Sequence, residues 1–308
     1  MNIETIQKAR VLVAGDAMLD RYWFGDAERI SPEAPVPVVR IERREERLGG
    51  AANVALNIAD LGANASLISV VGQDEAGERI RGLALEAGIH PELEFDPRLP
   101  TTVKLRVVAR QQQMLRCDFE ATPGEELLLK NLNRFPALLE KADTLVLSDY
   151  GKGGLSHIVR MIEYARSKNI PTLVDPKGDD YERYRGATII TPNRAELQQV
   201  VGRWRDEADL VEKTQNLREH LGLEYVLLTR SEEGMTLFKR DGIDNFPAQA
   251  REVYDVSGAG DTVIAVLSTM IATGAGIVEA VRTANRAGGI VVGKLGTASV
   301  SYQELFGK

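Results

Sequence analysis

Short apolar runs, most of them closed by a polar residue, alternate along this chain with amphipathic segments long enough to form helices. The runs lie at residues 11–16, 65–72, 144–149, 172–175, 188–193 and 225–229, and two of the amphipathic segments span residues 158–168 and 207–221. Continuous apolar runs are typical of strands buried on both faces, and their alternation with helices favours parallel pairing. The sequence therefore predicts an α/β fold, a three-layer sandwich in which helices cover both faces of a central, mainly parallel sheet.

Two stretches depart from this alternation, residues 21–47 and about 93–120. The first holds three prolines, and the second contains a hairpin pattern with an apolar face opposite Lys104, Arg106 and Arg110. We predict that both stretches form a small β-sheet lid attached to a single domain that spans residues 1–308. Its basic face is open to two interpretations, a solvated surface or a cover that closes over an anionic substrate.

Composition excludes several classes of protein. The 308 residues include 38 lysines and arginines against 45 aspartates and glutamates, a formal charge of −7. A protein whose main partner is nucleic acid or an anionic membrane needs a basic surface, so we expect neither partner. The single cysteine, Cys117, cannot form an intrachain disulfide, which indicates a reducing compartment. Because the N-terminus also has no apolar leader, we expect a cytoplasmic protein.

Polar side chains close four of the predicted strands. They are Asp16, Asp149, Asp175 and Asn193. In open α/β sheets, ligands bind at the carboxyl ends of the strands, so we expect the functional site at this edge of the sheet.

A glycine-rich segment precedes an apolar, helix-like stretch near the end of the chain. Gly258 and Gly260 leave backbone N–H groups free at the start of the predicted helix, where anions bind, and Asp261 places a carboxylate in the same space. Taken alone, the pattern has a second interpretation, a tight turn with Asp261 as a helix cap.

Two further motifs each have a functional and a structural interpretation. Asn193 and Glu196, three residues apart at a predicted helix start, could hold a hydrated magnesium ion beside phosphates, or could form a capping box. Gly49 and Gly50 could let a ligand approach the backbone, with Asn53 offering an amide to a sugar hydroxyl. Close packing of a helix on the sheet would explain the same residues.

With Gly49-Gly50 near its start, Asn193-x-x-Glu196 in its middle and residues 255–262 near its end, the chain resembles the ribokinase (PfkB) family of carbohydrate kinases over essentially its whole length. Residues 29–39, 147–153, 175–178 and 181–188 are similar to the branch of that family that acts on D-glycero-β-D-manno-heptose 7-phosphate. The resemblance implies a ribokinase-like fold with a β lid. It also implies transfer of a phosphoryl group from ATP to the anomeric hydroxyl, which gives heptose 1,7-bisphosphate for ADP-heptose and the lipopolysaccharide inner core.

The resemblance implies a role for each residue of these motifs. Asp261 is implied to be the general base that takes the proton from the attacking hydroxyl, and the loop of Gly258, Ala259 and Gly260 is implied to stabilise the transferring phosphoryl group. The residues implied to bind ATP and Mg²⁺ are Asn193, Glu196, Thr229, Gly234, Asp255 and Asn285, with the metal held by Asn193 and Glu196 through water. The residues implied to hold sugar hydroxyls are Asp16, Gly49, Gly50 and Asn53.

A substrate that already carries a phosphate at its far end needs a cationic receptor distant from Asp261. The basic face formed by Lys104, Arg106 and Arg110, with Arg116 nearby, would supply one. Lys152 and Lys177, at the ends of predicted strands, compete for the same role, and the sequence does not rank these cations.

Other functions stay open at this point. The chain could be a kinase of another sugar or sugar phosphate, or a non-catalytic sugar-binding regulator that keeps the fold. The exposed sheet edges expected on the lid favour a homodimer in which two lids clasp. The sequence leaves open the preferred anomer, dependence on a monovalent cation and fusion to a nucleotidyltransferase domain.

Overall fold

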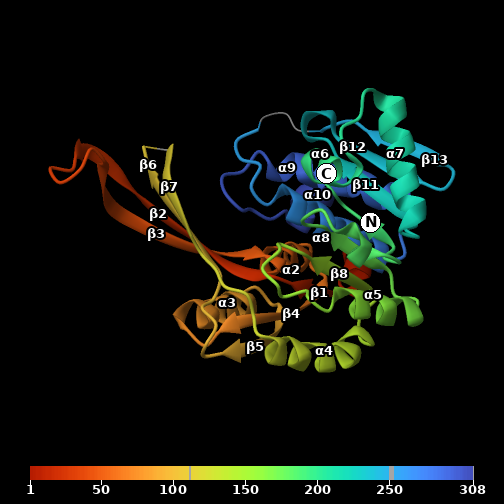
Figure 1. Cartoon of the computed structure of the whole chain (residues 1–308), viewed down its shortest axis with the longest axis horizontal. Coiled ribbons are helices and arrows are strands. Elements are labelled where there is room, and N and C mark those ends of the chain that lie inside the picture. The colour runs from red at the N-terminus through yellow and green to blue at the C-terminus, as the bar shows by residue number, and fades with distance from the viewer. Residues whose placement is uncertain (111, 250–252, 308) are drawn as a thin grey trace.

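The computed structural model describes residues 1–110, 112–249 and 253–307 of the chain. Within this part, the larger of two sheets has the strand order β13-β12-β11-β10-β9-β8-β1-β4-β5 (Figure 1). Its strands are β1 (Arg10–Gly15), β4 (Asn64–Gly72), β5 (His90–Asp96), β8 (Thr144–Ser148), β9 (Thr172–Asp175), β10 (Ile189–Ile190), β11 (Tyr225–Thr229), β12 (Met235–Lys239) and β13 (Gly242–Phe246). All neighbours from β11 to β5 pair in parallel, whereas β12 and β13 form an antiparallel edge.

Helices cover both faces of this sheet. The α-helices are α1 (Ile3–Ile6), α2 (Ala51–Asp60), α3 (Glu75–Glu86), α4 (Glu125–Leu139), α5 (Ile158–Ser167), α6 (Arg194–Val201), α7 (Glu207–His220), α8 (Ala259–Ala272), α9 (Ile277–Val291) and α10 (Tyr302–Phe306), with short 3-10 turns η1 (Tyr181–Tyr184) and η2 (Ser231–Glu233). None of the helices in the described ranges is long and apolar enough to cross a membrane.

Alternate residues of the central strands enter two separate hydrophobic clusters. In β1, Val11 and Val13 pack with α2, α8 and α9, whereas Leu12 and Ala14 pack with α4, α5 and α7. Because side chains of a strand alternate between its faces, a continuous apolar run is what two covered faces require. This confirms the predicted three-layer α/β sandwich with a mainly parallel central sheet.

The second sheet has the order β3-β2-β6-β7 and projects from the body of the molecule (Figure 1). It consists of β2 (Ala17–Ile30), β3 (Pro37–Gly50), β6 (Val103–Ala109) and β7 (Gln112–Phe119). We therefore find a small sheet where residues 21–47 and 93–120 were expected to form one. The boundaries differ, because residues 93–96 belong to β5 of the large sheet and β2 begins at Ala17; residue 111 lies outside the described residues.

The long β2–β3 hairpin begins and ends beside the carboxyl end of β1. The chain leaves β1 at Asp16 and returns at Gly50, and the backbone N–H of Ala51, the first residue of α2, donates to the Asp16 carbonyl at 3.0 Å. Gly50 has φ +57°, and a Cβ built there would lie 2.3 Å from that same carbonyl oxygen. Glycine is thus required at this junction for both its backbone conformation and its lack of a side chain.

Candidate active site

Asp261 is a buried acid at the carboxyl edge of the large sheet. It is the third residue of α8, and 3% of its surface is exposed. Its Oδ2 accepts a hydrogen bond from Asn53 Nδ2 of α2 at 2.7 Å, and its Oδ1 accepts one from the Tyr150 hydroxyl at 2.5 Å. Gly258, before the helix, has φ +77°, and a Cβ there would come within 3.0 Å of Asn53 Nδ2. The glycine loop therefore lets α2 and α8 approach closely enough for Asn53 to reach the carboxylate.

Burial raises the pKa of Asp261 from its ordinary value of 3.8 to about 6, against the opposing effect of the hydrogen bonds from Asn53 and Tyr150. Burial disfavours the charged form, whereas donors aimed at the carboxylate favour it. Asp20 of β2 raises this pKa and Lys104 of β6 lowers it, so charges on the small sheet also influence the pKa of Asp261. A carboxylate with a pKa close to 6 is suited to accept a proton near neutral pH.

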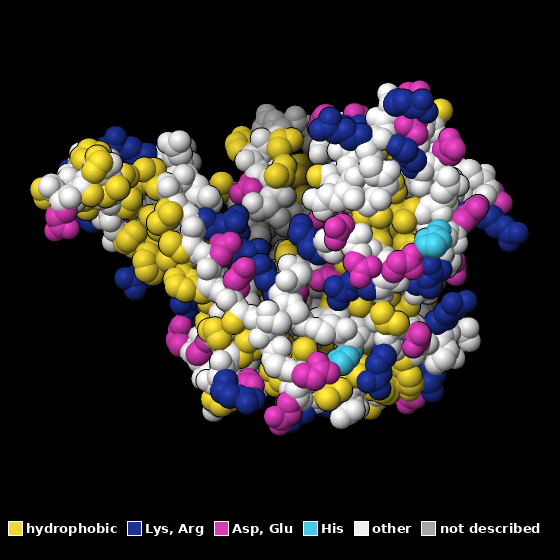
Figure 2. All heavy atoms as spheres, in the orientation of Figure 1, with side chains coloured by type: hydrophobic (Ala, Val, Ile, Leu, Met, Phe, Trp, Pro, Cys, Tyr) yellow, Lys and Arg dark blue, Asp and Glu magenta, His cyan; other side chains and the backbone are white. Residues whose placement is uncertain are grey.

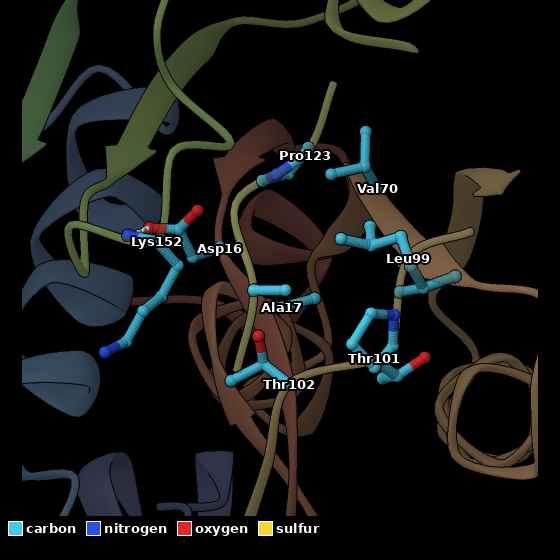
Figure 3. Close-up of a pocket in the computed structure, with 11 residues that line it drawn as sticks. Asp16, Ala17, Val70, Leu99, Thr101, Thr102, Pro123 and Lys152 are labelled. Atoms are coloured by element: carbon cyan, nitrogen blue, oxygen red, sulfur yellow. Dashed lines mark hydrogen bonds between the residues drawn. The ribbon is translucent and has the colours of Figure 1, made fainter. Parts of the chain in front are cut away.

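Asp16 is also buried, and its carboxylate binds the backbone of the loop that follows β8. Its carboxylate accepts hydrogen bonds from the backbone N–H groups of Tyr150, Lys152 and Gly154, at 2.9, 3.0 and 2.9 Å. Burial raises the pKa of Asp16. In Figure 3 the Lys152 side chain extends away from the Asp16 carboxylate, and its ammonium group pairs with Glu120. The cavity drawn there measures about 10 Å³, room for no more than a water molecule, so a sugar does not fit in it.

A much larger cleft, of about 820 Å³, lies between the small sheet and the body. Four arginines line it, and Figure 2 shows basic side chains in the hollow beside the projecting sheet. The four are Arg43, Arg47, Arg106 and Arg110. Because Arg43 and Arg47 of β3 share a face with Arg106 of β6, the basic surface is wider than the predicted hairpin face.

Each of these arginines has an acidic neighbour. Arg106 pairs with the buried Asp20 at 2.6 Å, Arg110 with Asp26 at 2.8 Å, and Arg43 and Arg47 with Glu45. The arginines of the cleft are therefore each paired with a carboxylate. Their exposed guanidinium groups can exchange a carboxylate partner for a phosphate, which they bind with the same fork geometry.

Arg47 also ties the small sheet to the body. Its Nη1 donates to the backbone carbonyls of Leu295 and Thr297 at 3.1 and 3.2 Å. Between them, the N–H of Gly296 donates to Asp255 at 2.9 Å, and Asp255 also accepts from the N–H of Ser257. Asp255 thus lines the arginine cleft and supports the glycine loop, rather than lining the pocket on the other side of that loop.

That second pocket is mainly apolar and measures about 340 Å³. Five of the predicted residues line it together: Thr229, Gly234, Ala259, Gly260 and Asn285. Met235, Val263 and Gly288 add apolar surface, as expected for a site that holds a planar ring. Loop 255–261 therefore separates two cavities, with Asp255 and Ser257 facing the arginine cleft and Ala259 and Gly260 facing the apolar pocket.

Asn193 and Glu196 form the capping box that the sequence left open. Asn193 Oδ1 accepts from the Glu196 N–H at 3.0 Å, Glu196 Oε2 accepts from the Asn193 N–H at 3.0 Å, and Lys177 pairs with Glu196 at 3.1 Å. No cluster of three or more acidic, histidine or cysteine residues that could hold a metal occurs in residues 1–110, 112–249 and 253–307. A hydrated Mg²⁺ ion, which keeps its waters and needs only hydrogen-bond acceptors, still fits beside Glu196, because each carboxylate oxygen retains a lone pair.

The structure brings some predicted residues together and separates others. Asp261 contacts Asn53, whereas Lys177 is held by Glu196 and Lys152 by Glu120, away from the arginine cleft. Gly49 packs against the side chains of Asp20 and Met18. Sequence reasoning missed Tyr150, Arg43 and Arg47. The unbroken run of charged residues along 43–47 was a signal for the two arginines. The contact between Tyr150 and Asp261, 111 residues apart, left no local pattern.

The pKa of Asp261 predicts a pH-dependent gain in stability for Asp261→Asn. A pKa raised in the folded state means that protonation stabilises the fold; this stability is complete below about pH 4 and is lost as the pH rises through about 6. At pH 8 the variant should be more stable than the parent by up to about 3 kcal/mol, and the difference should shrink towards pH 4. Urea unfolding at several pH values measures it, with Asp60→Asn, at the exposed end of α2, as the control for loss of a charge. A variant that is less stable at pH 8 would contradict the prediction.

Proteins of known sequence and structure were compared with the chain. It is 58% identical over 306 residues to a D-beta-D-heptose 7-phosphate kinase from Bordetella bronchiseptica, covering 99% of this chain and 97% of the relative. It is 53% identical over 310 residues to the bifunctional protein HldE of Hahella chejuensis, covering 99% of this chain and 64% of the relative. The chain thus spans less than two thirds of the bifunctional relative.

Solved structures share the fold at low sequence identity. Ribokinase from Arabidopsis thaliana, complexed with ribose and ATP, superposes with a TM-score of 0.78 at 19% identity, covering 97% of each chain. Phosphofructokinase-2 from Escherichia coli, with substrates and products, gives 0.81 at 20% identity, also over 97% of each chain. The sequence model for the pfkB family carbohydrate kinases matches residues 8–304. This chain belongs to the pfkB family of carbohydrate kinases.

Proposed function

We propose that this kinase transfers the γ-phosphoryl group of ATP to the anomeric hydroxyl of D-glycero-β-D-manno-heptose 7-phosphate, giving heptose 1,7-bisphosphate for ADP-heptose and lipopolysaccharide synthesis. The observation that carries the proposal is loop 255–261, which separates an arginine-lined cleft from an apolar pocket and ends at the buried Asp261. A phosphorylated sugar on one side and ATP on the other would meet at this loop. The 58% identical relative, named as a heptose 7-phosphate kinase, supports the choice of sugar.

In the proposed reaction, Asp261 takes the proton of the attacking hydroxyl. Its burial and pKa of about 6 leave it ionised at neutral pH and able to accept that proton. The N–H group of Gly260, in the first turn of α8, would stabilise the negative charge of the transferring group, because it lies at the helix N-terminus. The Ala259 N–H, which the sequence also suggested for this role, instead donates to the Val256 carbonyl at 3.2 Å.

ATP would occupy the apolar pocket, with Thr229, Gly234 and Asn285 along the nucleotide. Asn193 and Glu196 would hold Mg²⁺ through water, and the ion would neutralise charge on the phosphates. The predicted sugar contacts of Asp16, Gly49, Gly50 and Asn53 stay predictions. Of these residues, Asn53 is the one that donates a hydrogen bond to Asp261. A cytoplasmic location is part of the proposal, since Cys117 has no second cysteine with which to form a disulfide.

A phosphorus NMR spectrum of the protein with Mg-ATP and the heptose 7-phosphate, beside fructose 6-phosphate and ribose, tests substrate and position together. A new anomeric phosphate signal with the heptose alone is the expected result. Asp261→Asn should lower turnover about 10²- to 10⁴-fold while keeping nucleotide binding, because only the base is removed. Turnover of another sugar would overturn the substrate, and near-normal turnover of the variant would overturn the role of Asp261.

The arginine cleft predicts which variants lose affinity for the sugar phosphate. Arg43→Gln should raise the KM for the heptose 7-phosphate about tenfold or more and leave the KM for ATP unchanged, because a charge-assisted contact is lost. Arg44→Gln is the matched control, since Arg44 stacks on Trp23 on the opposite face of the same strand pair. Equal effects of the two variants would contradict a phosphate site in the cleft.

We propose further that two copies associate through their small sheets. Trp23, Val107 and Leu115 lie in one cross-strand row on the face away from the cleft, and Leu115 and Phe119 are each 55% exposed. The edge strands β3 and β7 add unpaired backbone groups that a second copy could cover. Sedimentation should show a dimer at micromolar concentration and dissociation in Leu115→Glu. A parent protein that sediments as a monomer would contradict the proposal.

A further inference from the structure

Tyr150 is the one phenol in contact with the Asp261 carboxylate in the part of the chain that the structure describes. Its hydroxyl donates to Asp261 Oδ1, while Asn53 donates to Oδ2 from the opposite side. Each carboxylate oxygen has two lone-pair positions, so this arrangement uses one on each oxygen. The remaining positions are free to accept the hydrogen of a substrate hydroxyl.

Two buried carboxylates accept hydrogen bonds from the backbone of the loop that carries Tyr150. Asp16 accepts from the N–H groups of residues 150, 152 and 154. Asp149, at the end of β8, accepts from the Gly151 N–H and from the Tyr184 hydroxyl, each at 2.9 Å. Hydrogen bonds to buried carboxylates are strong, so this loop is a rigid support for the phenol.

The environment of the Tyr150 ring keeps its hydroxyl protonated. Burial, together with the charges of Asp261, Asp175 and Asp20, raises the pKa of Tyr150 well above its ordinary value. Lys104 of β6 lies over the ring, with its Nζ 5.4 Å from the centroid. The ionisable groups that act on Asp261 therefore come from several elements: Asp20 from β2, Lys104 from β6, Tyr150 from the loop after β8, and Asp175 from β9.

We propose that Tyr150 is a positioning residue of the phosphoryl transfer, whose hydroxyl fixes the orientation of the Asp261 carboxylate and sets the lowest pH at which that group acts as a base. The inference rests on the proposed role of Asp261. A phenol does both because it donates one directed hydrogen bond to the ionised carboxylate and, being neutral, does not compete for the substrate proton.

Tyr150→Phe tests the inference, because it removes the hydroxyl and keeps the ring under Lys104. Loss of a donor to the carboxylate favours its protonated form, so the acid limb of the kcat/KM profile should move to higher pH. For a displacement of about one pH unit, kcat/KM falls about tenfold at pH 5.5 and stays near the parental value at pH 8.5.

Tyr181→Phe is the matched control. Tyr181 is also a buried tyrosine, but its hydroxyl has no hydrogen-bond partner among the residues that the structure describes, so its loss should leave the acid limb in place. Thermal unfolding of both variants checks that each is folded. A uniform loss of kcat/KM at every pH, a rise in sugar KM alone, or an unchanged profile for Tyr150→Phe would each overturn the inference.

Asp261→Asn separates this inference from the proposed function. If Asp261→Asn is inactive and Tyr150→Phe leaves the acid limb unmoved, Asp261 remains the base and only the role of Tyr150 fails. If Asp261→Asn keeps near-normal turnover, the proposed function of Asp261 fails first.

Discussion

A carboxylate taken out of water must be surrounded by hydrogen-bond donors, and this requirement organises the carboxyl edge of the large sheet. Asp16, Asp149 and Asp261 are all less than 7% exposed. Asp16 and Asp149 accept hydrogen bonds from backbone N–H groups within residues 150–154, and Asp149 also accepts one from the Tyr184 hydroxyl. Asp261 accepts from Asn53 and from the Tyr150 hydroxyl. Strands β1 and β8, the loop after β8 and the N-terminus of α8 are thereby joined through side chains as well as through packing.

The same edge divides the molecule into two environments. The pocket beside Val263 and Gly288 is apolar, whereas the cleft under the small sheet is lined by guanidinium groups. The segment that leads into α8 borders both, with Asp255 and Ser257 on the cleft and Ala259 and Gly260 on the pocket, and so does the segment after α9, with Val292 on the pocket and Gly296 on the cleft. Gly258, with φ +77°, lets the loop approach Asn53 of α2 closely, where a Cβ would come to 3.0 Å from the amide nitrogen. Gly260 follows in the first turn of α8, where N–H groups favour anions.

The sequence predicted both sheets, but it located the strands of the large sheet better than those of the small one. The strand expected at residues 172–175 is β9 itself, because a run buried on both faces is apolar throughout. Strand β2 was not recognised over its full length, because it is half solvated and two irregularities, between Phe24/Gly25 and Ala27/Arg29, interrupt its period of two. The antiparallel edge of β12 and β13 was not anticipated either.

For the site, the sequence indicated the residues that lie within a motif. Asp261 and the glycine loop belong to one segment, and Thr229, Gly234 and Asn285 meet Ala259 and Gly260 in one pocket. The sequence did not indicate which residues come into contact across the fold. Nothing in the residues around Tyr150 or Arg43 specifies the neighbours of these two side chains. The spacing of Asn193 and Glu196 is consistent with a magnesium site and with a capping box, and the structure contains the capping box.

Arg47 has a consequence for the fate of ATP when no sugar is bound. Its side chain spans from β3 to the carbonyls of Leu295 and Thr297, on either side of the Gly296 N–H that supports Asp255. Any swing of the projecting sheet away from the body breaks these contacts and loosens the support of the glycine loop. A water molecule that reached the γ-phosphate in that open form would meet an incompletely assembled set of N–H donors. The contacts of Arg47 would thus link the arrangement of the glycine loop to the position of the projecting sheet, and would lower hydrolysis of ATP in the absence of sugar.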